Sequence, residues 1–517
     1  MDRKWWTLLA VCIGTFMLLL DVTIVNTALP YIERALGASF TDLQWVIDAY
    51  ALSLAALLLT GGSLADLFGR RRIFVAGLVV FTIASLACGL ATTPLMLNLS
   101  RAVQGIGGAL MFATSLALLA GAFQGADRGT AFGLWGATTG AAVAIGPLVG
   151  GALTEGLGWE YIFFINVPIG IGAIALTLAK VDEGAEWKTP GGRIDWPGLV
   201  TFSSGLFCLI FALIRGNAEG WSSGIIVGLL AAAAILLVTF VVVEGRRPDP
   251  MLDLSLFRRP AFNGASLAAF ALSASMFAMF LYLTLYIQNA LGYGALEAGV
   301  RFLPVTLLSF AVAPVSGKLA QRLGVRWFIA GGLALVGVGL LLMRQIGPGD
   351  DWTALLAGFM VAGGGIGLVN PALATAAISV VEPQRAGMAS GINSTFRQVG
   401  IATGTAGLGA IFAHVVNGEL ETFGVAARRA GLDLAAGAQR AGEFSDFVAF
   451  GVFRRVGGGD AVALAGREAF LSGLHQILLY AGGFALVSAA LCALLIRPGG
   501  FAHEPWAAAP EPERAAA

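Results

Sequence analysis

The chain has 517 residues, of which 57% are hydrophobic and only 12% are charged. Soluble domains carry roughly 45–50% apolar and about 25% charged residues, so this composition excludes an ordinary soluble protein. The formal net charge is zero, which gives no reason to expect a nucleic-acid partner. The four cysteines lie in apolar runs, without the spacing of a metal site or a disulfide framework.

The first apolar run, from about Trp5 to Leu29, is longer than the roughly 7–15 residues of a signal-peptide core, so we expect a retained transmembrane helix. Crossing a bilayer as a helix takes about 20 apolar residues. By this rule the sequence predicts an all-α integral membrane protein with fourteen spans. They begin near Trp5, Leu43, Ile73, Pro94, Gly129, Tyr161, Trp196, Ser222, Phe262, Ala298, Trp327, Trp352, Gly387 and Ser472.

Arginine and lysine in the short loops predict the orientation. With the N-terminus inside, eighteen fall on the cytoplasmic side and three outside. We therefore expect a multi-pass protein of the bacterial cytoplasmic membrane with both termini in the cytoplasm. Residues 416–471 would form a long extracellular loop, either a cap over the outer mouth or a flexible linker, and 497–517 a cytoplasmic tail.

Two segments recur along the chain. "GTAFGLWGATTGAAVAIGPLVGGAL" from Gly129 aligns its glycines with "GMASGINSTFRQVGIATGTAGLGAI" from Gly387, and "GSLADLFGRR" from Gly62 has a weaker copy, "GKLAQRLGVR", from Gly317. The repeat predicts six helices (1–180), two inserted helices with their flanking loops (181–260) and six more helices (261–496). Parallel repeats of this kind are a transporter architecture, whereas a membrane enzyme or scaffold has no need for them.

Four motifs carry a resemblance to a known family. They are "LDVTIVNTALP" from Leu20, "GSLADLFGRRR" from Gly62, "LNLSRAVQGIGGA" from Leu97 and "GAAVAIGPLVGG" from Gly140. With them the chain resembles the fourteen-helix drug:proton antiporters of the major facilitator superfamily. The resemblance implies the major facilitator fold, with two pseudo-symmetric six-helix bundles, and proton uptake at the acid of the first helix, here Asp21.

Asp21 lies within the first apolar run, where a charge costs about 2.5–3.5 kcal/mol and marks an ion or proton path by default. Arg101 and Gln104 share one face of the fourth span, and Arg101 keeps its proton, so it would favour deprotonation of a nearby acid. We expect Asp21, Arg101 and Gln104 to couple protons to transport. The alternatives are a static ion pair at Asp21 and a structural hydrogen-bond hub at Arg101.

Four further polar residues are candidates for the substrate site. Asn26 shares a helix face with Thr23 and Thr27, roughly opposite Asp21. Asp48 lies near the outer end of the second span, and the resemblance implies attraction of cationic substrates there; the alternative is a solvated acid at a helix end. Arg397 and Gln398 lie within the thirteenth span, where their burial would imply a cavity or a relay.

The loop after the second span predicts a gate. Gly62 and Gly69 permit a tight turn, and Asp66, Arg70 and Asp127 would form a charge cluster that stabilises the outward-open state; the alternative is a plain positively charged loop.

The fifth span has one face of small residues that a partner helix can approach closely. These residues are Gly129, Gly133, Gly136, Gly140, Ala144, Pro147 and Gly151. The exporter motif that the resemblance places there comprises Gly140, Gly146, Pro147, Gly150 and Gly151.

Together these features predict a proton-coupled exporter, not an enzyme, that extrudes amphipathic drugs or other cationic or neutral lipophilic compounds by alternating access. The alternatives are a dedicated exporter of one antibiotic, lipid or siderophore, and a non-transporting scaffold or sensor. The sequence has no GxxxxGK[ST] loop, so we expect no role for ATP. We also expect no metal and no cofactor other than the proton, no partners but the substrate and the bilayer, and a monomer.

Overall fold

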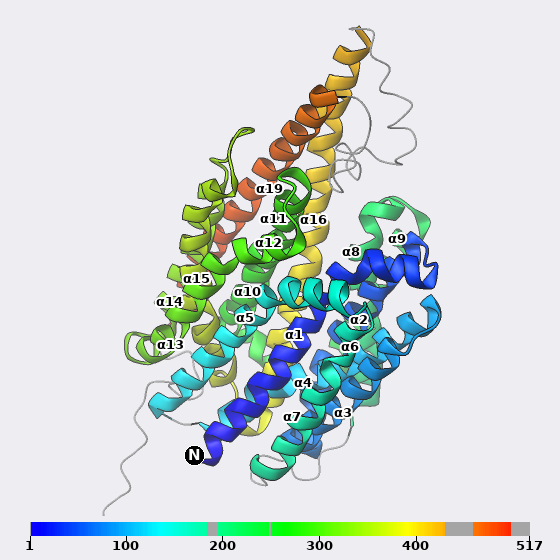
Figure 1. The fold of residues 1–517 in the computed structure, drawn as a ribbon. Coiled ribbons are helices and arrows are strands. Elements are labelled where there is room, and N and C mark those ends of the chain that lie inside the picture. The colour runs from blue at the N-terminus through cyan, green and yellow to red at the C-terminus, as the bar shows by residue number, and fades with distance from the viewer. Residues whose placement is uncertain (1, 124, 183–193, 248–249, 430–458, 498–517) are drawn as a thin grey trace, which may run out of the picture.

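The structure is a computed structural model that describes residues 2–123, 125–182, 194–247, 250–429 and 459–497. Thirteen helical stretches in these ranges are long and apolar enough to cross a membrane. The fifth expected span corresponds to a continuous 32-residue helix, α5 (Gly125–Gly156), which completes the fourteen. Within the described ranges every regular element is helical, and the fold class is the one expected from the sequence (Figure 1).

The first half of the chain contains one group of packed helices. Ser39 and Asp42 form a capping box that begins the second helix, and Thr93 caps the fourth. Besides α5, these helices are α1 (Arg3–Leu36), α2 (Phe40–Phe68), α3 (Arg70–Gly89), α4 (Pro94–Ala122), α6 (Tyr161–Phe164) and α7 (Asn166–Lys180). Their core includes Met17, Phe81 and Trp135, all almost completely buried.

The inserted helices α8 (Trp196–Glu219) and α9 (Gly224–Glu244) form a hairpin. α8 packs against α2 and α16, while α9 is largely exposed on its outer side, as expected of a helix that faces lipid. A short 3₁₀ turn, η2 (Leu254–Arg258), leads from the hairpin into the second half.

The second half repeats the arrangement of the first. One span is continuous through two π-helical turns, so that α10 (Pro260–Leu272), η3 (Ser273–Phe277), α11 (Ala278–Leu285) and η4 (Tyr286–Ala290) follow one another. The remaining elements are α12 (Ala295–Arg301), α13 (Leu303–Leu323), α14 (Val325–Met343), η5 (Trp352–Leu355), α15 (Leu356–Ser379), η6 (Pro383–Arg385), α16 (Ala386–Arg429) and α19 (Gly459–Leu495).

The structure differs from the sequence at the expected 416–471 loop. α16 continues to Arg429 and α19 begins at Gly459, so both ends of that segment are helical, and residues 430–458 lie outside the described residues. Figure 1 shows α16 and α19 extending together beyond the other helices. The helix α16 therefore does not end where the apolar span does, at about residue 419.

The two halves meet through repeat-related glycines at the face that carries the N-terminus, which we call the N-terminal face. A Cβ atom on Gly62 of α2 would collide with the carbonyl of Gly387 at the start of α16, and one on Gly317 of α13 would collide with the carbonyl of Gly129 on α5. Each contact pairs the 62–72 motif, or its copy, with the glycine-rich helix of the opposite half. The internal repeat therefore appears in space as two equivalent backbone contacts between the halves.

Candidate functional site

Asp21 lies on α1 inside the first half, where three side chains donate to its carboxylate. Arg101 Nη1 lies 2.5 Å from Oδ2, while Gln104 Nε2 and Asn166 Nδ2 lie 2.9 and 3.0 Å from Oδ1. Arg101 and Gln104 come from one face of α4, and Asn166 begins α7. The side chains of Asp21 and Arg101 are 0% and 2% exposed, so the ion pair is shielded from solvent.

Arg101 is held from several sides at once. Its Nε donates to the carbonyl of Val46 at 3.0 Å, and its Nη1 also donates to Gln104 Oε1 at 2.7 Å. The Tyr50 ring lies 4.2 Å from the guanidinium carbon. The guanidinium is therefore oriented by a carbonyl, an amide and an aromatic ring in addition to Asp21.

This geometry makes the charge of Asp21 interdependent with that of Arg101. Arginine does not release its proton under physiological conditions. Protonation of Asp21 would leave the buried guanidinium without a counter-charge, which costs several kcal/mol. The two buried charges therefore stabilise each other, and loss of either one leaves the other without a partner.

Asp48, expected either as a substrate acid or as a solvated helix-end acid, is 9% exposed. Arg215 on the inserted helix α8 donates to Gln44 Oε1, on the same helix as Asp48, and to Glu219 Oε1, both at 2.7 Å. Asp48 is therefore a largely buried acid, and the ion pair of Arg215 is with Glu219.

Arg397 lies on α16 between two asparagines of the second half. Its Nη2 donates to Asn370 Oδ1 at 2.9 Å and its Nε to Asn393 Oδ1 at 3.3 Å. Arg397 and Gln398 are half-buried. The preceding part of the same helix, from Gly387 to Thr395, is buried. The Asn26 side chain lies outside the described residues, so its expected place in a substrate site stays a prediction.

The residues expected to form a gate, Asp66 and Arg70, lie at the N-terminal face. Arg70 Nη2 lies 3.3 Å from Asp66 Oδ1 within the first half. The same carboxylate accepts hydrogen bonds from the backbone N–H groups of Gly387 and Met388, at 2.9 and 2.8 Å, at the start of α16. A carboxylate at a helix N-terminus is stabilised by the orphan N–H groups and by the helix dipole.

Asp127 and the small face of α5 were also expected to take part in contacts between helices. Asp127 accepts a hydrogen bond from Lys4 Nζ at 2.6 Å, and its place in one charge cluster with Asp66 and Arg70 stays a prediction. The small face of α5 meets the second half, where Gly133 and Gly140 lie toward α13 and Gly136 lies against Asn370 of α15. Gly146 and Gly150 lie off that face, against Thr23 and Thr27 of α1.

The members of the exporter motif differ in their surroundings. A Cβ on Gly140 would lie 3.9 Å from Ser309 Oγ, an ordinary contact with the second half. One on Gly151 would meet nothing within 4 Å. The Pro147 side chain lies outside the described residues.

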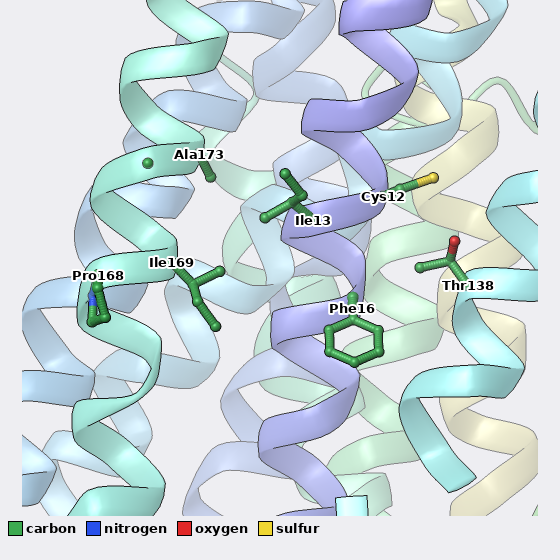
Figure 2. A pocket seen from close by; sticks show the side chains of 8 residues that line it. Cys12, Ile13, Phe16, Thr138, Pro168, Ile169 and Ala173 are labelled. Carbon is green, nitrogen blue, oxygen red and sulfur yellow. The ribbon is translucent and has the colours of Figure 1, made fainter. Parts of the chain in front are cut away.

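An open groove lies between α1, α5 and α7. Its volume is about 600 Å³ and its lining is almost entirely apolar. Figure 2 shows Ile13 of α1 and Ile169 of α7 pointing into the space between these two helices, while Cys12 and Thr138 lie toward each other on the opposite side of α1. The lining residues are Cys12, Ile13, Phe16, Thr138, Pro168, Ile169, Gly172 and Ala173.

Sequence reasoning did not identify Asn166, Asn370 or Asn393 as site residues. Asn166 also donates to Ser85 Oγ at 3.0 Å, and so connects Asp21 to α3. Asn166 and Asn370 are amides within apolar spans, next to or two residues before a proline, in "FFINVPIG" and "GLVNPAL". That local pattern was the available signal, because a buried amide needs a partner.

Comparison with known proteins places the geometry in context. The family model of the Major Facilitator Superfamily matches residues 11–405. The chain is 36% identical over 416 residues to the multidrug resistance protein Stp of Mycobacterium tuberculosis (strain CDC 1551 / Oshkosh), covering 80% of this chain and 77% of that protein. It is 33% identical over 499 residues to the tetracenomycin C resistance and export protein of Streptomyces glaucescens, covering 95% and 91%. It is 36% identical over 410 residues to the puromycin resistance protein pur8 of Streptomyces alboniger, covering 78% and 81%.

Solved structures share the fold at low sequence identity. The human organic anion transporter MFSD10 superposes with a TM-score of 0.61 at 14% identity, covering 95% of this chain and 100% of that one. A bacterial homologue of the human lysosomal transporter Spinster, in an inward-facing unoccupied conformation, gives a TM-score of 0.59 at 18% identity, covering 98% and 99%. At these identities the likeness shows the fold alone.

Proposed function

Because this chain belongs to the major facilitator superfamily, we propose that it exports amphipathic, lipophilic small molecules in exchange for protons. The chain is a multi-pass membrane transporter and not an enzyme. The observation that carries the proton coupling is the buried pair of Asp21 and Arg101, together with the two amides that complete the carboxylate's hydrogen bonds. An ionisable residue inside a membrane bundle is expensive and marks an ion or proton path.

The proposed cycle follows from the charge balance at this pair. A proton from outside binds Asp21 once rearrangement has separated it from Arg101, and the neutral acid favours return to the state open to the cytoplasm. Substrate binding and the renewed approach of Arg101 then favour release of the proton inside. Inward movement of one positive charge gains about 2.3 kcal/mol per 100 mV of membrane potential.

The N-terminal face is the proposed cytoplasmic face, because the short loops there collect the arginines and lysines of the positive-inside pattern. On this assignment the Gly62–Gly387 and Gly129–Gly317 contacts form the cytoplasmic gate. Opening the transporter to the cytoplasm then requires these two backbone contacts to separate. No ATP, metal or other cofactor has a role in this scheme, and the chain acts as a monomer.

A second candidate is a dedicated exporter of one antibiotic. It is favoured by relatives that are named for single compounds, tetracenomycin C and puromycin. A resistance panel in a host that lacks its own efflux pumps separates the two: protection against many unrelated compounds supports multidrug export, whereas protection against one chemical family supports the dedicated exporter.

The direct test is substrate-dependent proton movement across everted membrane vesicles, measured with a pH-sensitive dye while a chemical library is added. The proposal predicts that some compounds dissipate the proton gradient with wild-type protein and not with Asp21→Asn. The proposal is contradicted if every transported compound is moved equally well by wild type and by Asp21→Asn, and no compound causes proton movement.

A further inference from the structure

Two buried acids of the first half are already paired with a cation of the protein. Asp21 is paired with Arg101 and Asp66 with Arg70, both within ion-pair distance. These two acids are therefore poorly suited to attract a positively charged substrate, because each already has a counter-charge.

Arg397, by contrast, is a cation without a carboxylate partner among the described residues. Its two hydrogen-bond partners are the neutral amides of Asn370 and Asn393, and no described carboxylate forms an ion pair with it or acts on its charge. Its terminal nitrogen Nη1 donates to none of the described residues. A positive charge within a membrane-spanning bundle is costly without an anion or water nearby, so this side chain lacks the counter-charge that Arg101 has.

The position of Arg397 is at the junction between the two halves. Asn370, which accepts from its Nη2, lies opposite α5: a Cβ on Gly136 would be 3.3 Å from the Cβ of Asn370. Gly391, earlier on the helix of Arg397, lies against Leu58 and Leu59 of α2. Arg397 is only partly buried, so its side chain keeps some accessible surface at this junction.

We propose that Arg397, oriented by Asn370 and Asn393, binds an anionic group of the transported molecule, such as a carboxylate, sulfonate or phenolate on an amphipathic aromatic compound. Both asparagines turn their Oδ1 atoms toward the guanidinium, which leaves their amide N–H groups as donors at the same place. A site made of donors fits an anion and repels a cation. The planar guanidinium can also bind a carboxylate through two parallel hydrogen bonds.

This inference rests on the proposed exporter function and specifies its substrate class. It departs from the cationic or neutral compounds that the sequence favoured. It also assigns different tasks to the two central arginines: Arg101 is neutralised by Asp21 within the first half, and Arg397 is neutralised by the substrate. On this view an anionic substrate removes the cost of an unpaired charge between the halves.

The test compares matched probes on the full-length protein in lipid nanodiscs. The panel contains aromatic carboxylates and their neutral carboxamides, such as anthraquinone-2-carboxylate and anthraquinone-2-carboxamide, with binding measured by calorimetry. A hydrogen bond to a charged group contributes about 1.5–3 kcal/mol, so we expect carboxylates to bind about ten- to a hundredfold more tightly than their amides. This comparison uses the wild-type protein and does not depend on the folding of a variant.

Variants then test whether the preference for carboxylates depends on Arg397. Arg397→Gln should reduce it to within about twofold, and Arg397→Lys should keep part of it because the charge remains. The matched control is Arg344→Gln. Arg344 donates to the His475 carbonyl, far from Arg397, at the face opposite the N-terminal face. Its replacement also removes a positive charge but should leave the preference for carboxylates unchanged. A panel in which no carboxylate binds wild type more tightly than its amide overturns the proposal, as does a preference that persists in Arg397→Gln.

A transport arm separates this inference from the exporter function itself. If neutral or cationic compounds drive proton movement equally in wild type and Arg397→Gln, while anions are not transported, the exporter function stands and the anion site is refuted. If no compound of any charge is transported with protons, the exporter function fails as well.

Discussion

The carboxylate of Asp66 accepts a hydrogen bond from the backbone N–H of Gly387, a residue 321 positions later in the chain, at 2.9 Å. The bond joins the end of α2 to the start of α16 and so crosses from one half of the transporter to the other. The backbone N–H of Met388 donates to the same carboxylate, and Arg70 of the first half forms an ion pair with Asp66. One buried side chain thus stabilises the closed contact at the N-terminal face.

Replacement of Asp66 by Asn should weaken this contact. The amide has no charge to interact with the N-terminus of α16 or with Arg70, and hydrogen bonds to a charged group contribute about 1.5–3 kcal/mol. Spin labels at exposed Phe68 and Glu382, one on each half, should report a smaller closed population by electron–electron distance measurement. Asp182→Asn, which removes an exposed ion pair with Arg3 near the same face, is the control and should leave the distances unchanged. Unaltered distances in Asp66→Asn would contradict the role of this bond.

The glycine contacts give a second prediction about the same face. Gly62→Ala and Gly317→Ala each place a Cβ against a carbonyl of the opposite half, so each should shift the label distances toward separation. The two variants should act in the same direction, because the contacts are equivalent under the internal repeat. Gly331→Ala on α14 introduces a methyl group into open space and should have no effect. A shift from only one of the two sites would show that the halves do not separate as equivalent units.

Removal of one partner of the Asp21–Arg101 pair should destabilise the protein more than removal of both. Asp21→Asn leaves a buried guanidinium without an anion. Breaking a buried ion pair in this way lowers the free energy of unfolding by about 3–5 kcal/mol. The double variant Asp21→Asn/Arg101→Gln should recover much of that loss. Thermal unfolding of the two single variants and the double variant in detergent measures the coupling. Additive losses would mean that the two charges do not interact as the 2.5 Å distance indicates.

Asp253, in the segment between the inserted helices and α10, gives a pH-dependent prediction. Burial alone would raise its pKa, but hydrogen bonds from Ser255 and the charges of Arg385 and Arg259 together hold the pKa below the ordinary 3.8. A lowered pKa in the folded state means that the stabilisation is present above pH 3.8 and is lost as the pH falls through the lowered value. The pair with Arg385 is partly exposed, so we expect a contribution below about 1 kcal/mol.

The measurement compares the unfolding temperatures of wild type and Asp253→Asn at several pH values. Wild type should be slightly more stable near neutral pH, and the difference should disappear in strong acid. A difference that grows on acidification would contradict the sign of the pKa shift.

Much of the architecture could be predicted from the sequence because its signals are local. Twenty-residue apolar runs indicate helices, and the positions of Asp21 and Arg101 within such runs mark them as unusual. The repeat offset also predicted that the 62–72 motif has a counterpart near Gly317. In the structure both copies meet the glycine-rich helix of the other half.

Other features depend on packing that a single sequence does not encode locally. Asp127 and Lys4 are far apart in the chain, and only the arrangement of α1 beside α5 brings them together. Arg215 donates to Gln44 because the inserted helix α8 packs against α2, and helical periodicity does not say which side of the bundle an inserted pair occupies. The helix α16 continues past its apolar span, and hydrophobicity alone does not mark where such a helix ends.

The central claim is that export is driven by proton exchange at Asp21. The most direct test reconstitutes wild type and Asp21→Asn in liposomes and measures substrate and proton fluxes together under an imposed pH gradient. Wild type should move substrate against its concentration gradient with a counterflow of protons that stops when the pH gradient collapses. Asp21→Asn should still bind substrate but show neither uphill transport nor proton flux. Undiminished uphill transport with proton counterflow in Asp21→Asn would contradict the account.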